Sequence, residues 1–378
     1  MKFFETVRNG WKRVDKALFL MPALLSVFSV VLLRSAVAND AATIAINSGM
    51  YKTQAIITAA SWVVAFIICA IDYSSVVKLS VVYAPFAIGL SLLVFTSLGI
   101  EVAGDKAWLD LKFITIQPSE LLKIAFITTF AMHLSHVGEN INKIGSLLLL
   151  LLHAAVPMGI VFLQGDDGTL LVFALIAAIM MFGAGLSWLY IIPCLIALPV
   201  VGYLVWNHVM KDFQKMRFLV LFNDELDPLG IGYHQRVSKL ALGSGQLTGK
   251  GLYGSEYVKV PEVANDFIFS YVGQCFGFIG CAVVLLVFLF ICLKILADSR
   301  IARDPLGKHI CIGVFAMVII HCMLNVGMVV GKFPVVGVPL PFLSQGGTSA
   351  LAFYIGIGLV MSTYAHCEKK HKVFYDND

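Results

Sequence analysis

The chain has 378 residues, of which 59% are hydrophobic and only 13% are charged. Soluble domains carry about 25% charged residues, so this composition excludes a surface covered by water and indicates a polytopic membrane protein. The formal net charge of +4 is small, and the sequence gives no support for a nucleic-acid partner.

A helix that crosses the hydrocarbon core of a bilayer needs roughly 20 apolar residues. We therefore predict an all-α membrane protein, a single membrane domain over residues 1–378, with about ten transmembrane helices. The only long polar insertion, residues 207–266, falls between the seventh and eighth of them. The predicted helices cover residues 18–37, 53–72, 79–99, 118–136, 146–163, 168–185, 187–206, 267–293, 309–331 and 346–365.

Lysine and arginine concentrate on the cytoplasmic side of membrane proteins. Here they concentrate in residues 1–17, in the segment ADSRIARDPLGKH and in the tail, residues 366–378. With ten helices these three segments share one side of the membrane. We therefore predict that both termini are cytoplasmic and that residues 207–266 form a large extracytoplasmic loop.

The segment QPSELLK opens the fourth predicted helix. Glu120 and Lys123 stand three positions apart, so they share a helix face and can pair. A charge in the middle of the membrane costs at least ~2.5 kcal/mol, so both side chains should point into the bundle. The pattern fits a functional site and a structural ion pair equally well.

The segment LQGDDGT places two adjacent acids, Asp166 and Asp167, in a tight outward turn. An aspartate before a helix often accepts hydrogen bonds from the first N–H groups of that helix. A solvated capping turn and a substrate contact are therefore both open at this position.

The long outward insertion is basic and partly apolar. Its stretches FLVLF and HQRVSKLAL predict elements at the membrane interface, and its cations, among them Arg236, Lys239 and Lys250, suit a phosphorylated lipid. The glycine-rich turn GSGQLTGKG is not a nucleotide-binding P-loop, because Ser244 and Gly251 stand where that motif requires Gly and Ser/Thr. Such a turn can still offer backbone N–H groups to phosphate oxygens.

Two further segments flank the last predicted helices. In VPEVANDFIF, Asp266 lies directly before an apolar run. Three explanations are open: the carboxylate is merely tolerated there, it caps the following helix, or it takes part in a reaction. In PFLSQGGTS, the glycines allow the chain to turn closely into the last helix, and backbone packing is the simpler explanation.

Five segments occur together and in order: GDKAWLDLKFITIQPSELLKIA, LQGDDGT, DPLGIGYHQRVSKLALGSGQLTGKG, VPEVANDFIFSYVGQCFGFIG and NVGMVVGKFPVVGVPLPFLSQGGTS. On these segments the chain resembles, over nearly its whole length, the SEDS family (shape, elongation, division and sporulation), which contains RodA and FtsW. The short N-terminus, Gln164 and NVGMVVG lean toward RodA-like members.

The resemblance implies a peptidoglycan glycosyltransferase of cell elongation or division. Such an enzyme polymerises lipid II, an undecaprenyl-pyrophosphate disaccharide-peptide, on the outer face of the bacterial cytoplasmic membrane. The implied partner is a class B penicillin-binding protein, together with other elongasome or divisome membrane proteins. The acid of the family maps onto Asp266, and Glu120 and Lys123 fall on positions needed for activity.

The chemistry explains why one carboxylate is enough. Glycosidases need a second acid to protonate a poor leaving group, whereas a lipid pyrophosphate leaves readily. We therefore predict Asp266 as the general base and Glu120 and Lys123 as further catalytic residues. The candidate substrate-binding residues are Trp108, Asp166, Arg236, Lys239, Ser244, Lys250, Glu262, Ser344, Gly346 and Gly347.

No organic cofactor is predicted. The leaving pyrophosphate needs positive charge, which the loop cations or a divalent cation such as Mg²⁺ or Mn²⁺ would supply. The eight cysteines form no metal-ligand spacing, so no metal ligands are assigned.

Two other functions fit the same sequence. A lipid II flippase would need a polar path across the bilayer, and a non-catalytic scaffold would only recruit or activate the penicillin-binding protein. The sequence departs from the family pattern at six positions, none of them a predicted catalytic residue. Because of these departures, the scaffold function remains an alternative and the paralogue is not assigned. The departures lie at Gly165, Asp167, Ala264, Gln274, Cys275 and Gln345.

Overall fold

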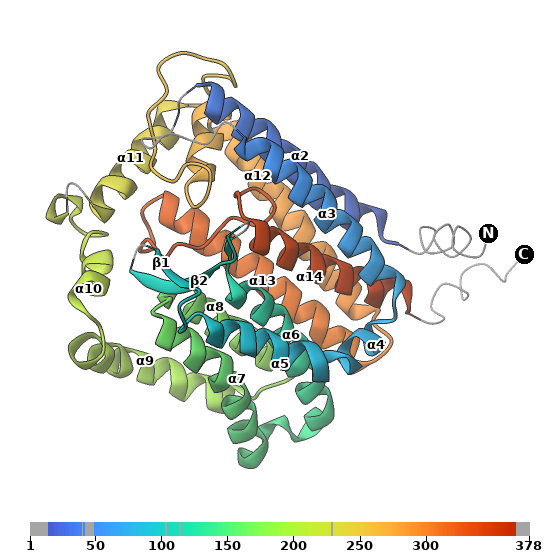
Figure 1. Cartoon of the computed structure of the whole chain (residues 1–378). Helices are drawn as coiled ribbons and strands as arrows, with labels where there is room; N and C mark the ends of the chain where they lie inside the picture. Colours follow the sequence, from blue (N-terminus) through green and yellow to red (C-terminus); the bar gives the residue numbers. More distant parts are fainter. Residues whose placement is uncertain are drawn as a thin grey trace, which may run out of the picture.

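The computed structural model describes residues 14–39, 41, 49–102, 104–112, 115–227 and 230–367. Most of the predicted N-terminal segment 1–17 and of the tail 366–378 lies outside the described residues. Within them, regular structure is mainly helical, as predicted (Figure 1). The helices are α2 (Lys16–Ala38), α3 (Met50–Ala70), α4 (Tyr73–Lys78), α5 (Ser80–Leu93), α6 (Pro118–Val137), η1 (Gly138–Asn142), α7 (Ile144–Gln164), α8 (Asp167–Gly183), α9 (Trp188–His208), α10 (Asp212–Leu219), η2 (Asp224–Leu226), α11 (Ile231–Ser244), α12 (Ile268–Arg300), α13 (Pro305–Val329) and α14 (Gly347–Ala365).

The ten predicted apolar runs all contain helices. In the described residues, eight helices are long and apolar enough to cross a membrane. Two shorter apolar helices, α5 with 14 residues and α8 with 17, complete the set. The third prediction, 79–99, was too long, because α5 ends at Leu93 and the chain then turns into a strand at Gly99.

A small antiparallel sheet, absent from the all-α prediction, follows α5. It consists of β1 (Gly99–Val102), β2 (Asp105–Asp110) and β3 (Thr115–Ile116), in the order β1-β2-β3. Ile100 pairs with Trp108 across the first two strands. Along β2, Ala107 and Leu109 are buried while Trp108 between them is half-buried, the alternation expected of a strand. The sheet therefore fixes the direction of Trp108.

Helix α13 lies at the centre of the bundle and contacts α6, α8, α12 and α14. Most of its side chains are buried. Helix α9 is the opposite case: it lies at the edge of the bundle, and none of its residues is buried (Figure 1). Positions on α13 are thus held by packing, whereas α9 is exposed to the surrounding lipid.

The long polar insertion contains α10, η2 and α11, and their predicted place at the membrane interface stays a prediction. Its glycine-rich turn packs on a kink in α12. The N–H groups of Lys250 and Gly251 donate to the carbonyls of Gln274 and Cys275, at 2.9 and 2.8 Å. At the kink, Gly277 has φ 63°, and a Cβ there would lie 2.5 Å from the carbonyl carbon of Leu247. Only glycine fits this contact.

The two ends of the bundle differ. Figure 1 shows α10, α11 and the β1–β2 hairpin at one end, whereas the start of α2 and the end of α14 lie at the other. We call the first of these the hairpin end.

Candidate functional site

A cavity of about 510 Å³ lies at the hairpin end. Helices α6, α8, α12 and α14 all begin beside it, because their first residues or the residues just before them form its wall. Six of the predicted site residues line it: Trp108, Asp166, Glu262, Asp266, Gly346 and Gly347.

Asp266 is half-buried in the wall of this cavity, just before α12. The N-cap residue of α12 is Phe267, and no side chain caps this helix, so the capping explanation of Asp266 is not supported. Burial raises the pKa of Asp266 to about 7, and the negative charges of Glu262 and Asp166 contribute to the rise. A carboxyl group with this pKa is matched to accepting a proton near neutral pH.

The backbone around Asp266 is held from two sides. Asn325 on α13 donates from Nδ2 to the carbonyl oxygen of Asp266 at 2.8 Å. Ser344 donates from Oγ to the carbonyl of Asn265, and Gln345 N–H donates to the carbonyl of Ala264 at 2.8 Å. The predicted site residue Ser344 is therefore a buried support of the site and does not line the cavity.

Asp166 caps α8, one of the two functions that the sequence left open, and it also lines the cavity. Its Oδ1 accepts from the N–H of Thr169 at 2.9 Å and caps α8. Its Oδ2 accepts from Nε2 of Gln117 at 3.0 Å, and the same side chain lines the cavity. The capping bond thus fixes a carboxylate that also faces the site.

Asp105 is an acid of the cavity that the sequence analysis missed. Burial, and then the charge of Asp166, raise the pKa of Asp105 to about 6. Its Oδ1 is buried and has no hydrogen-bond partner among the described residues. This oxygen is therefore available to a group that enters the cavity.

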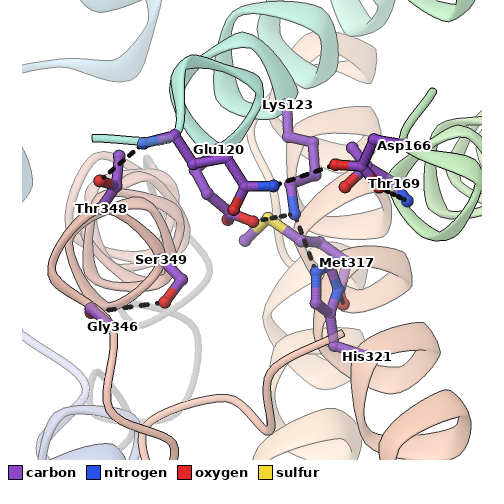
Figure 2. Close-up of polar contacts among 10 residues, drawn as sticks. Glu120, Lys123, Asp166, Thr169, Met317, His321, Gly346, Thr348 and Ser349 are labelled. Carbon is purple, nitrogen blue, oxygen red and sulfur yellow. Dashed lines mark hydrogen bonds and ion pairs between the residues drawn. The ribbon is translucent and has the colours of Figure 1, made fainter. Parts of the chain in front are cut away.

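Glu120 and Lys123 form a buried ion pair beneath the cavity wall and do not line it. Lys123 Nζ lies 2.8 Å from Glu120 Oε1 and 2.9 Å from Nε2 of His321 (Figure 2). His321 Nδ1 lies 2.7 Å from the carbonyl of Met317. A carbonyl only accepts, so Nδ1 carries the proton, and the bare Nε2 accepts from Lys123. The pair thus connects α6 to α13 beneath the cavity, and its predicted catalytic role stays a prediction.

The predicted cations do not face the cavity. Arg236 and Lys239 lie on α11, and Lys250 donates from Nζ to the carbonyl of Glu256 at 2.7 Å. Ser244 donates to the carbonyl of Ala241 at 2.8 Å. Among the described residues, the lining contains four acids and no lysine or arginine.

Helix N-termini supply positive potential in place of these cations. The first N–H groups of a helix have no intrahelical partner and carry partial positive charge. At α14 no side chain caps the helix, and its first residues, Gly347, Thr348 and Ser349, line the cavity. This helix start can therefore receive an anionic group.

Three lining residues that sequence analysis did not single out had readable positions. Asp105 lies in the quoted segment GDKAW, Gln117 precedes the helix-starting Pro118, and Thr348 follows the Gly346–Gly347 pair. The backbone N–H of Gln117 also donates to Oγ1 of Thr348 at 3.3 Å. For Gln117 and Thr348, the available signal was a polar residue at the start of a helix.

Two of the departures from the family pattern have local explanations. Gly165 ends α7 with φ 83°, a conformation that proline cannot adopt. Gln274 accepts from the N–H of Val258 and donates to its carbonyl at 3.2 Å, which requires an amide. Neither residue lines the cavity.

Sequence comparisons agree with this architecture. The family described as "Cell cycle protein", covering FtsW, RodA and SpoVE, matches residues 15–369. The chain is 34% identical over 280 residues to the peptidoglycan glycosyltransferase MrdB of Escherichia coli (strain K12), covering 73% of this chain and 75% of MrdB. It is 32% identical over 359 residues to the probable peptidoglycan glycosyltransferase FtsW of Trichlorobacter lovleyi, covering 93% of each chain.

The fold is also found among solved structures. A chain from a structural study of polymerization and crosslinking by a peptidoglycan synthase complex superposes with a TM-score of 0.79 at 24% identity, covering 93% of this chain and 97% of that chain. The family match extends over nearly the whole sequence, and the relatives align across most of their length. The chain therefore belongs to the FtsW/RodA/SpoVE family of multi-pass membrane proteins.

Proposed function

We propose that this protein is a peptidoglycan glycosyltransferase that polymerises lipid II on the outer face of the cytoplasmic membrane, with Asp266 as general base. The observation that carries the proposal is the setting of Asp266: a half-buried carboxyl group that caps no helix and lines a cavity of about 510 Å³, where burial raises its pKa to about 7. The relatives named as peptidoglycan glycosyltransferases support the same activity.

In the proposed reaction, the Asp266 carboxylate takes the proton of an acceptor sugar hydroxyl. The hydroxyl oxygen forms a bond to the anomeric carbon of the donor, and the bond from that carbon to the pyrophosphate oxygen breaks. The electron pair leaves with the lipid pyrophosphate, so no general acid is required. The half-buried side chain of Trp108 offers an apolar face to a sugar ring.

The leaving pyrophosphate is placed at the start of α14 in this proposal, next to Gly346 and Gly347. The uncapped N–H groups there carry positive partial charge. Arg236, Lys239 and Lys250 would meet a headgroup only outside the lining of the cavity, as an outer ring of charge.

A divalent cation such as Mg²⁺ or Mn²⁺ fits the acidic lining. In the described residues no group of three or more metal-ligating side chains gathers, so a cation would be held by one or two carboxylates and by phosphate oxygens. Asp105, with its unpartnered Oδ1, and Asp166 are the residues that we propose to hold it. When bound, the cation would neutralise charge on the pyrophosphate.

The proposal includes a side of the membrane and a partner. Both termini are placed in the cytoplasm and the hairpin end outside, where lipid-linked sugars are joined. A class B penicillin-binding protein, within the elongation or division machinery, is the proposed partner that crosslinks the product. The fold shared with a chain of a peptidoglycan synthase complex supports this assignment.

The decisive experiment measures glycan polymer formed from lipid II by the purified protein in detergent. We expect Asp266→Asn to abolish polymer, because an amide cannot accept the proton. Glu256→Gln is the matched control, since Glu256 lies exposed in the same outward insertion and does not line the cavity. Polymer at the wild-type rate from Asp266→Asn would remove Asp266 from the mechanism. Translocation of lipid II in vesicles without any polymer would instead support a flippase, and neither activity would leave a scaffold.

A further inference from the structure

Two polar residues on α13 share one face of the helix. His321 and Asn325 are four positions apart, and both side chains are fully buried. Polar groups inside a membrane-spanning helix are costly and are retained when they have partners. Each is flanked by apolar residues in the sequence, whereas the structure connects each to a different part of the site. We call these two residues the α13 pair.

Asn325 joins the two segments that meet at Asp266. Its Nδ2 donates to the carbonyl of Asp266 and to the carbonyl of Val338, each at 2.8 Å. Val338 lies between Gly337 and Pro339, which line the cavity. A Cβ placed on Gly337 would lie 3.7 Å from Asp266 Oδ2, so this loop rests against the carboxylate itself. One amide thus fixes both the acid and the wall opposite it.

His321 fixes the other half of the site from one helical turn away. It accepts from Lys123, which in turn contacts Glu120 in the first turn of α6. The residue before that turn is Gln117, whose side chain donates to Asp166. The starts of α6 and α8 are therefore attached to the same face of α13 that holds the Asp266 loop.

We propose that Asn325 is a positioning residue for Asp266, and that with His321 it makes α13 the common support on which the acid, the Gly337 loop and the start of α6 are aligned. Asn325 does not line the cavity and takes no proton. Its two donated bonds leave Oδ1 buried without a partner among the described residues. The orientation of the amide is thus set by the two carbonyls, both of which need its donor side.

The structural test is hydrogen–deuterium exchange of the full-length protein in detergent. Asn325→Leu removes both donors, and Asn325→Ser can restore one. We expect exchange in residues 262–267 and 334–345 to accelerate about tenfold in Asn325→Leu and less in Asn325→Ser, since a buried carbonyl that loses its donor is left unsatisfied. Met323→Leu is the control, because Met323 lies on the lipid-exposed side of the same helix. Exchange confined to the neighbourhood of residue 325 would overturn the proposal.

The functional test rests on the proposed polymerase activity. We expect Asn325→Leu to lower kcat for lipid II about tenfold or more with little change in KM, and to move the pH midpoint of the rate toward lower pH as Asp266 becomes more hydrated. Asn325→Ser should recover part of kcat. A purely structural role would lower the amount of folded protein and leave the midpoint of the remainder unchanged, which would contradict positioning. If wild-type protein makes no polymer, the proposed function fails, while the exchange experiment still decides this inference.

Discussion

At the scale of single residues, the site is defined by carboxyl groups in different surroundings. Asp166 accepts two hydrogen bonds, whereas no hydrogen bond from the described residues reaches the carboxylate of Asp266. The charge of Asp166 then adds to the burial that raises the pKa of Asp266. One aspartate therefore prepares the other as a base, a division between two acids that enzymes use repeatedly.

The raised pKa of Asp266 predicts how the rate of polymerisation depends on pH. Only ionised Asp266 can accept a proton, so the rate should rise with pH and reach half its maximum near the pKa of Asp266, about 7. Glu262→Gln removes a negative charge that raises this pKa, so its midpoint should move to lower pH. The measurement is the rate of polymer formation from lipid II between pH 5 and pH 9, where Glu256→Gln should keep the wild-type midpoint. A midpoint that moves upward in Glu262→Gln would contradict the assignment.

At the scale of elements, α6 and α13 are joined by a buried charge cluster. Lys123 and Glu120 are almost completely buried, and His321 completes the coordination of the ammonium group. Removing one partner of a buried pair leaves the other charged and unpaired, which costs about 3–5 kcal/mol. Removing both partners is much less costly, because no uncompensated charge remains.

We therefore predict that Lys123→Met lowers the thermal unfolding temperature strongly and that the double variant Glu120→Gln/Lys123→Met recovers most of the loss. Both variants should lose polymerase activity, because the start of α6 is no longer tied to α13. Unfolding temperature can be followed by size-exclusion chromatography of heated, detergent-solubilised protein. Lys308→Met, a change at an exposed lysine, should match wild type. A double variant as unstable as Lys123→Met would show that charge balance is not the cause.

At the scale of the whole molecule, the two ends of the bundle carry different chemistry. The hairpin end holds the acidic cavity, whereas the end of α12, the turn after it and the start of α13 carry Arg300, Arg303 and Lys308 at the opposite end. Basic residues in short connections between spans face the cytoplasm in most membrane proteins. This short basic connection therefore supports the proposed orientation.

Thiol labelling tests this orientation. In spheroplasts, a membrane-impermeant maleimide should label Glu101→Cys, which lies in β1 at the hairpin end, without permeabilisation. Lys308→Cys should be labelled only after the membrane is opened. The parent protein provides the background from its own cysteines, of which Cys194 is exposed. Labelling of Lys308→Cys in intact spheroplasts would reverse the proposed topology.

The helices were predictable because their signal is a long apolar run. Each of the ten apolar runs contains a helix, and the errors in the predicted helix ends lie where polarity changes gradually, as at the end of α5. The β1–β3 sheet was missed because its strands are short and half-exposed, so they have no buried face long enough to read. Such strands depend on pairing rather than on composition.

The site was predictable in part for the same kind of reason. Asp266 and Asp166 stand out as acids beside apolar runs, and both line the cavity. The position of Gln117 before Pro118 was readable, but its bond to Asp166 and the bond of Asn325 to Asp266 were not, because these partners lie 49 and 59 positions away in the chain. The loop cations were predicted to contact the substrate, but they do not line the cavity. A sequence shows which residues are charged but not which way their side chains point.

Helix α9 has a consequence for how the sequence can vary. None of its 21 residues is buried, and it contains two prolines, Pro193 and Pro199. Its contacts with the other described residues lie at its ends, where Tyr190 donates to the carbonyl of Asn142 and Trp206 packs on Phe218. Between these contacts, lipid requires only that the side chains be apolar. Substitutions of one apolar residue by another should therefore accumulate freely in α9, whereas the buried positions of the bundle should accept few residue types.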